Sequence, residues 1–258
     1  MEYRVNLLDF DIAIGRHKPR TNVSYRHDAC PFCNRAALTD IIATSGEMIF
    51  LRNKYNVLIG AEQFVLIESE DCKADIPTYT KEHMQAYLEF AFREWFRLVD
   101  SGRYQAVIMF KNSGPLSGGT ITHPHSQIIA FPQIEAELMV HPAEFEGILV
   151  KEENGVLVNA ATSPRIGFAE YNFLMDEVNP GSIGTLAHFL QQTVIFLKDF
   201  FSHQPELSYN LFFYLVEGKV RVKVLPRFAT SPLYIGYNIH LKPTNILEAR
   251  EMLKGYLG

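Results

Sequence analysis

Two histidines on either side of a single proline form the segment of this chain with the clearest chemical potential. They lie in the stretch GGTITHPHSQIIAFP at 118–132. Proline fixes its own φ and restricts the residue before it, so His123 and His125 are held in an extended geometry. Gln127 has the same alternate spacing and therefore shares their face of a strand. Such a pair can also be an ordinary surface feature, so the neighbouring residues must decide.

A glycine-rich loop, KNSGPLSGG at 111–119, comes just before the histidines. Backbone amides in loops of this kind can approach phosphate oxygens closely and cradle them. The apolar run QIIAF at 127–131 is typical of a buried strand, which gives a reactive side chain a rigid support. Loop, histidines and strand together favour phosphate chemistry at a local site.

The three cysteines suggest a second kind of site. Cys30 and Cys33 are too close in CPFC for an ordinary structural disulfide, and in a reducing compartment this spacing favours a metal or a redox pair. Nothing around them resembles the βαβ context of a thioredoxin, and no His-x-Glu motif precedes them as in a zinc deaminase. The plain alternative is three unrelated reduced cysteines.

Composition limits the possible partners. The 258 residues are 47% hydrophobic and 21% charged, which is ordinary for a soluble globular protein. A formal charge of -5 gives no basic field for nucleic acid, and a zinc-ribbon binder would need a second Cys-x-x-Cys. No stretch approaches the roughly 18 apolar residues that span a bilayer, and the first residues lack the apolar core of a signal peptide. We expect a cytoplasmic protein that binds neither nucleic acid nor membranes.

The apolar pattern predicts the same series of elements twice. A helix is expected at 80–102, where apolar residues recur every three or four positions, with strands at 47–53, 56–62 and 63–71 before it and at 104–114 after it. The second half predicts a pair of strands at 166–177, a helix at 182–201 and two strands at 208–227; the stretch LYIGYNIH at 233–240 ends on His240 where the first half has its histidine pair.

This repetition predicts a divergent duplication. Strand, acidic turn, helix and strand follow in the same order at 67–112 and at 173–216. We therefore predict an α+β protein of two tightly packed repeats, each an antiparallel sheet with a packed helix. The expected domains are 1–140 and 141–258, divided near 135–145.

The segment KNSGPLSGGTITHPHSQ resembles the active-site segment of the galactose-1-phosphate uridylyltransferase branch of the histidine triad superfamily, as a bacterial subgroup of it. The pattern of that branch is roughly Asn-x-Gly, a small-residue loop and His-Pro-His-x-Gln. The resemblance implies two histidine-triad-like repeats and a His125 that attacks the α-phosphorus of a nucleoside diphosphate sugar or dinucleotide, forming a nucleotidyl-histidine. The other ring nitrogen of His125 would bond the carbonyl of His123.

Gln127 stands where the histidine triad hydrolases carry a third histidine. An amide can bond a phosphoryl oxygen but has no proton to give to a leaving group. This difference favours transfer to a phosphate acceptor over rapid hydrolysis.

The resemblance also implies a metal site. Bacterial members of the branch bind zinc through Cys-x-x-Cys, a histidine after a strand and the first histidine of His-Pro-His. The corresponding residues are Cys30, Cys33 and His123, with Cys72 in place of the family's histidine that follows a strand. Cys₃His is a closed tetrahedral set, so we expect one structural zinc per chain, which would fix His123 and through it His125.

Further residues match the family less closely. Asn53 would contact the nucleoside, or be a turn residue, and Arg16 and Lys18 would approach the phosphates or ribose, or form a solvated basic turn. Arg227 is either a phosphate ligand or part of a surface ion pair, and His240 a strand-end or acceptor-site residue without a second metal. The loop residues implied to hold the phosphoryl group are Asn112, Gly114, Gly118, Gly119 and Thr120.

The expected protein is a nucleotidyltransferase or phosphorylase acting on a nucleoside diphosphate sugar or dinucleotide, and the resemblance implies a homodimer. Two alternatives stay open. A non-catalytic nucleotide-binding regulatory protein would keep the zinc and the pocket without turnover, and a slow hydrolase of nucleotide conjugates would need no phosphate acceptor.

Overall fold

The structure is a computed structural model that describes residues 8–21, 29–134, 140–167, 169–203, 206–238, 240–241 and 243–258. Within these residues ten strands form one sheet in the order β1-β2-β3-β5-β4-β9-β10-β8-β7-β6, and every neighbouring pair is antiparallel. The strands are β1 Ile41–Ser45, β2 Met48–Arg52, β3 Glu62–Ile67, β4 Ala106–Ser113, β5 His125–Phe131, β6 Gly147–Glu153, β7 Val156–Ala161, β8 Tyr171–Met175, β9 Ser208–Val216 and β10 Lys219–Arg227.

The strand order contains the predicted duplication. Read from one edge the sheet runs β1-β2-β3-β5-β4, and read from the other it runs β6-β7-β8-β10-β9, which is the same sequence of steps. Along the chain, helix α2 (Lys81–Val99) lies between β3 and β4 of the first repeat, and α3 (Pro180–Phe200) lies between β8 and β9 of the second. The α+β prediction of two antiparallel repeats, each with one packed helix, is confirmed. β4 and β9 join the repeats into one continuous sheet.

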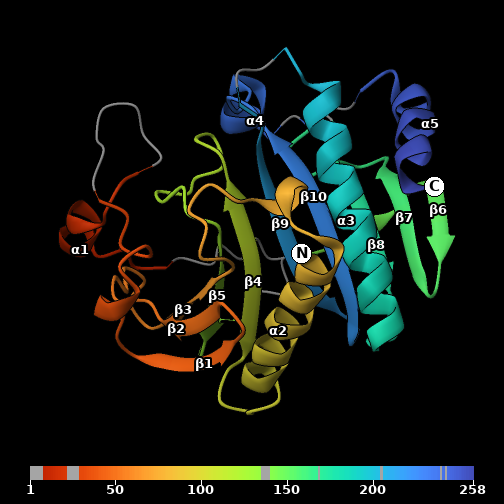
Figure 1. Cartoon of the computed structure of the whole chain (residues 1–258). Helices are drawn as coiled ribbons and strands as arrows, with labels where there is room; N and C mark the ends of the chain where they lie inside the picture. Colours follow the sequence, from red (N-terminus) through yellow and green to blue (C-terminus); the bar gives the residue numbers. More distant parts are fainter. Residues whose placement is uncertain are drawn as a thin grey trace.

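Both long helices cover the same face of the sheet (Figure 1). The apolar stripe predicted for α2 is buried there, and the Trp95 indole donates to the Val107 carbonyl over 2.8 Å. The side chain of Thr80 caps the first turn by accepting from the His83 amide. Because α2 and α3 occupy this face, the site must lie on the other face. The shorter helices are α1 Ile12–His17, α4 Pro232–Tyr237 and α5 Ile246–Leu257, with 3₁₀ turns at Arg35–Ala37, Ile76–Thr78 and Pro142–Phe145.

Several sequence predictions need correction. The strand expected at 56–62 is a turn in which Leu58 makes only an isolated bridge to Phe10. Of the pair expected at 166–177, β8 forms, while the carboxylate of Glu170 accepts from the Arg165 and Ile166 amides and holds a turn before it. The expectations also missed β1 and the hairpin of β6 and β7, whose turn carries the Asn154-Gly155 pair typical of tight hairpins.

The second repeat has no counterpart of the histidine pair. Its β9 and β10 are joined directly by the turn at Glu217 and Gly218, while 232–237 is helical. His240 therefore does not end a strand; its Nδ1 lies 3.0 Å from the Pro164 carbonyl oxygen. No helix in the described part of the chain is long and apolar enough to cross a membrane.

Candidate active site and metal cluster

Strand alternation aims His125 away from the helices. Ser126 faces Lys111 of β4 in the sheet register, and both side chains are buried on the helix side. The residues next to them in each strand, His125 and Asn112, therefore lie on the opposite face, together with Gln127.

The tautomer of His125 follows from its hydrogen bond. Its Nδ1 lies 2.8 Å from the carbonyl oxygen of His123, and a carbonyl can only accept, so Nδ1 carries the proton. The lone pair is then on Nε2. Burial lowers the pKa of His125 to about 4, outweighing the bond to His123, which raises it, so the ring is neutral near pH 7. Phe32 packs edge-on against the ring at 5.3 Å. The bond implied by the family resemblance is present, and no group in the described part of the chain bonds Nε2.

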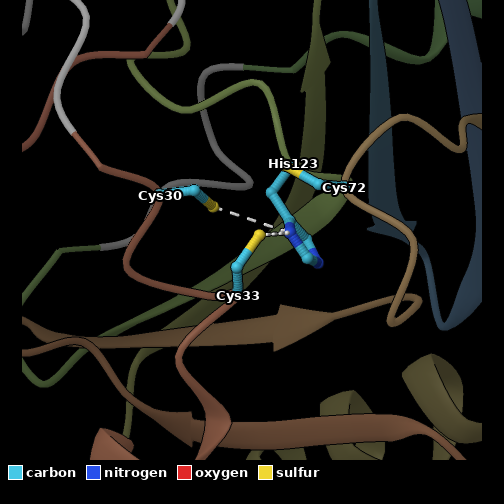
Figure 2. Close-up of side chains that lie close together, drawn as sticks. All are labelled: Cys30, Cys33, Cys72 and His123. Carbon is cyan, nitrogen blue, oxygen red and sulfur yellow. Dashed lines mark hydrogen bonds between the residues drawn. The ribbon is translucent and has the colours of Figure 1, made fainter.

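The three cysteines and His123 form one cluster (Figure 2), in which the four potential ligand atoms lie within 4.8 Å of one another. The Nδ1 of His123 is 3.6 Å from the sulfur of Cys30 and 3.6 Å from that of Cys33. Its Nε2 donates to the carbonyl of Ser69 over 2.8 Å, which leaves Nδ1 as the ligand atom. A backbone carbonyl behind the imidazole is the usual support of a metal-bound histidine.

The donor set fits a metal ion. Burial and the nearby Cys33 and Cys30 sulfurs raise the pKa of Cys72 to about 12, so this environment opposes ionisation of the Cys72 thiol unless a cation compensates it. Three thiolates and one imidazole are ligands that zinc accepts in tetrahedral sites. The cluster can therefore hold a metal, and it is compatible with zinc.

A cavity of about 250 Å³ opens beside His125. Seven of the residues singled out in the sequence line it: Lys18, Asn53, Gly118, Gly119, Thr120, His125 and Gln127. Its walls are partly apolar, which suits a nucleobase or sugar ring between polar anchors. The apolar wall includes Phe32, Leu38, Leu51, Val65 and Ile121.

The remaining candidate residues lie elsewhere. Arg16 is exposed in the last turn of α1 and does not line the cavity. Asn112 pairs with Asn210 of β9 and Gly114 begins the loop next to Ser208; neither lines the cavity. Gly114 has a φ of +80°, and a Cβ there would lie 2.4 Å from the Ser208 hydroxyl oxygen, so only glycine fits. Arg227 donates to Asn210 over 2.6 Å and makes neither a described surface ion pair nor a contact with the cavity.

The N-terminal segment ties itself to the loop. The Thr21 amide donates to the Thr120 carbonyl over 2.8 Å, and the Thr122 amide donates to the Thr21 hydroxyl over 2.7 Å. Lys18, three residues before Thr21, is thereby held at the cavity. Burial lowers the pKa of Lys18, and the charge of Arg20 lowers it further.

A buried polar network on the opposite side of β5 from His125 escaped the sequence analysis. Glu68 is fully buried and accepts hydrogen bonds from Lys111 (2.8 Å), Ser126 (2.7 Å) and Tyr79 (2.8 Å). Tyr87 bonds Ser126 over 2.6 Å. The available signal was a lysine within the apolar strand AVIMFKN, because a buried charge needs a partner. The network holds β5 from the side opposite to His125.

Comparison with known proteins shows which family the chain belongs to. Residues 10–134 match the model described as the N-terminal domain of "Domain of unknown function (DUF4931)", and residues 137–257 match its C-terminal domain. The chain belongs to the DUF4931 family. A crystal structure of a DUF4931 family protein from Bacillus cereus ATCC 10987 is 40% identical, with a TM-score of 0.75 over 84% of this chain and 99% of that one.

More distant structures share the fold of this DUF4931 protein. An ADP-glucose phosphorylase from Arabidopsis thaliana, solved with bound ADP-glucose, has a TM-score of 0.73 at 13% identity, covering 96% of this chain and 98% of its own. A uridylyltransferase has a TM-score of 0.70 at 16% identity, covering 92% and 94%. No curated protein matches the chain. These likenesses confirm the fold that the His-Pro-His segment predicted, that of galactose-1-phosphate uridylyltransferase-like proteins.

Proposed function

We propose that this DUF4931 protein is a nucleotidyltransferase or phosphorylase that works through a nucleotidyl group carried on His125. The observation that carries the proposal is the free Nε2 of a neutral imidazole at the cavity, with Nδ1 committed to the His123 carbonyl. Likeness in fold to an ADP-glucose phosphorylase and a uridylyltransferase supports this class of reaction.

The proposed reaction has two in-line displacements. Nε2 of His125 attacks the α-phosphorus of a nucleoside diphosphate sugar or dinucleotide, a nitrogen–phosphorus bond forms, and the bond from that phosphorus to the bridging oxygen breaks. The leaving phosphate keeps the bonding electrons. A phosphate oxygen of the acceptor then attacks the same phosphorus and releases neutral His125. Splitting the transfer in this way replaces one difficult step by two easier ones.

Around the phosphorus, the protein would supply hydrogen bonds without transferring a proton. Gln127, Gly118 and Gly119 line the cavity beside His125, and the Gln127 side-chain amide and the Gly118 backbone amide would bond the phosphoryl oxygens. Lys18, Thr120 and Asn53 line the same cavity, and Asn53 would contact the nucleoside. Since Gln127 cannot protonate a leaving group, a phosphate acceptor is favoured over water.

We further propose that the cysteine cluster holds one structural zinc per chain. Cys30, Cys33, Cys72 and His123 would fill a tetrahedron and leave no position for substrate. Its contribution would be to anchor His123, whose carbonyl orients His125. Homodimer formation and a cytoplasmic location remain proposals from the resemblance and composition; light scattering of the purified chain tests the first.

The experiment is intact-protein mass spectrometry after incubation with nucleoside diphosphate sugars and dinucleotides, without an acceptor. The proposal predicts an acid-labile gain of one nucleoside monophosphate, absent in His125→Ala and retained in the control His188→Ala, a histidine of α3 away from the cavity. Binding of nucleotide with no adduct from any donor would instead favour a regulatory protein. Release of monophosphate to water alone would favour the hydrolase.

A further inference from the structure

The second repeat reaches the loop beside the nucleophile through one buried amide. Asn210 of β9 lies opposite Asn112 of β4 in the sheet register and is 1% exposed. Its Nδ2 donates to Asn112 Oδ1 over 2.6 Å and to the Ser117 carbonyl over 3.0 Å. One side chain of the second repeat thus binds both the end of β4 and the backbone of the loop that follows it.

Arg227 decides which way this amide faces. Its Nη1 lies 2.6 Å from Asn210 Oδ1, and a guanidinium can only donate. The oxygen of Asn210 must therefore face Arg227, and its NH₂ group must face the loop. The opposite orientation would bring two sets of donors together at Arg227 and two oxygens together at Asn112.

The same reasoning fixes the next amide. Asn112 Oδ1 is used as the acceptor from Asn210, so its Nδ2 is the end that remains available, and no group among the described residues accepts from it. Asn112 shares a sheet face with His125, on the adjacent strand. Gly119 lies directly over it, since a Cβ on Gly119 would be 3.1 Å from Asn112 Cβ.

We propose that Arg227 and Asn210 are positioning residues that fix the polarity of the Asn112 amide, so that its Nδ2 donates to the phosphoryl group transferred to His125. This inference rests on the proposed function for its final step only. The two hydrogen bonds that link Arg227 through Asn210 to Asn112, called the amide chain below, are a property of the free protein. The second repeat would thereby contribute to catalysis without touching the substrate.

Matched variants separate polarity from packing. Asn210→Asp keeps the shape and the bond to Arg227 but removes both donors to the loop. Arg227→Met removes the donor, whereas Arg227→Lys keeps one. A second series of hydrogen-bonded amides, away from His125, supplies the control. In it Lys223 donates to Asn172 over 2.7 Å and Asn172 donates to Asn159 over 2.8 Å. Asn159 in turn donates to the Phe145 carbonyl over 2.9 Å. Asn172→Asp is the control variant.

The first measurement is the nuclear magnetic resonance spectrum of the Asn112 side-chain amide in the free protein, assigned by its loss in Asn112→Asp. The proposal predicts that its signals move in Asn210→Asp and Arg227→Met but stay in place in Arg227→Lys and Asn172→Asp. Unmoved signals in Asn210→Asp or Arg227→Met would overturn the amide chain. This result does not depend on any activity.

The second measurement is the rate of nucleotidyl adduct formation, compared with noncovalent binding of a nucleoside diphosphate. Loss of a preset donor is expected to slow adduct formation about 100-fold in Asn210→Asp and Arg227→Met while binding changes little. Arg227→Lys should restore most of the rate. Equal loss in Asn172→Asp, or a normal rate in Asn210→Asp, would overturn the catalytic role. Absence of any adduct in the unaltered protein would contradict the proposed function instead, and the spectrum would still decide on the amide chain.

Discussion

The two repeats have the same strand order but differ in the connection between their last two strands. In the first repeat, residues 114–124 separate β4 from β5 and carry the glycine loop and His123, and β5 itself starts at His125. In the second repeat, β9 and β10 are joined by Glu217 and Gly218 alone. The shared scaffold therefore supplies position and rigidity, and the proposed chemistry depends on the inserted loop.

The repeats also differ in how each uses a buried lysine. Lys111 lies on the helix face, bound to Glu68 behind the nucleophile strand. Lys223 lies on the open face and donates to the Glu144 carbonyl over 2.6 Å, beneath the ring of Phe145. Residues 142–145 thus fill, in the second repeat, the face that the first repeat leaves open beside His125. The first repeat carries the proposed nucleophile His125, and the second repeat supports the loop beside it.

The largest expected effect is on His125 itself. His125→Ala removes the nitrogen proposed to attack phosphorus, so turnover is expected to fall by about 10⁴-fold or more. Thermal unfolding should change little, because no other side chain depends on His125 for a hydrogen bond among the described contacts. Adduct formation in this variant at the normal rate would place the nucleophile elsewhere.

Removal of either buried lysine is expected to be strongly destabilising, with different effects on chemistry. Lys111→Met leaves Glu68 buried without its cation, and Lys223→Met leaves Glu170 in the same state, so each should cost about 3–5 kcal/mol of unfolding free energy. At a temperature where both variants remain folded, only Lys111→Met should slow adduct formation. Equal slowing in both would show that the repeats do not divide their roles. Chemical denaturation and single-turnover rates measure the two effects.

The metal cluster should be stoichiometric and removable. Elemental analysis is expected to find about one zinc per chain, and Cys72→Ser should lower its affinity by about 10–100-fold or more, since a closed site loses one of its ligands. His123→Ala should reduce both stability and activity, because the same residue is a metal ligand and holds His125. A fully folded native protein without metal would contradict the assignment.

The smallest expected effect compares two glycines with similar backbone conformation. Gly114 has φ +80° and its Cβ position is blocked by Ser208, whereas Gly218 has φ +74° with nothing within 4 Å of that position. Gly218→Ala should cost about 1 kcal/mol from backbone strain alone, and Gly114→Ala clearly more, with slower adduct formation. Denaturation midpoints of the pair measure this difference. Equal costs would show that the loop can move away from β9.

Most candidate site residues of the first repeat could be predicted from the sequence, but the contacts by which the second repeat supports them could not. The family resemblance predicted the cluster of Cys30, Cys33, Cys72 and His123, whereas the spacing of Cys30 and Cys33 alone indicated only a metal or a redox pair. Asn210 gave no signal, since its function depends on β9 lying next to β4, a contact between residues 98 positions apart. The strand expected at 56–62 failed because an apolar run was mistaken for a strand when its residues form a turn against Phe10.

Likewise, the histidine expected to end a strand in the second half was assigned by analogy with the first. His240 follows a short helix instead, and the corresponding hairpin is too tight to carry a loop. Duplication predicted the scaffold correctly, but it does not transfer a site between repeats, because the loop that makes the site was not repeated.

The central claim is that Nε2 of His125 forms the bond to phosphorus. The most direct measurement is the phosphorus nuclear magnetic resonance spectrum of the adduct on protein labelled with ¹⁵N in its histidine rings. The account predicts a phosphoramidate signal split by one-bond coupling to Nε2, and its loss in His125→Ala. An adduct coupled to Nδ1, or one that persists in His125→Ala, would contradict the account.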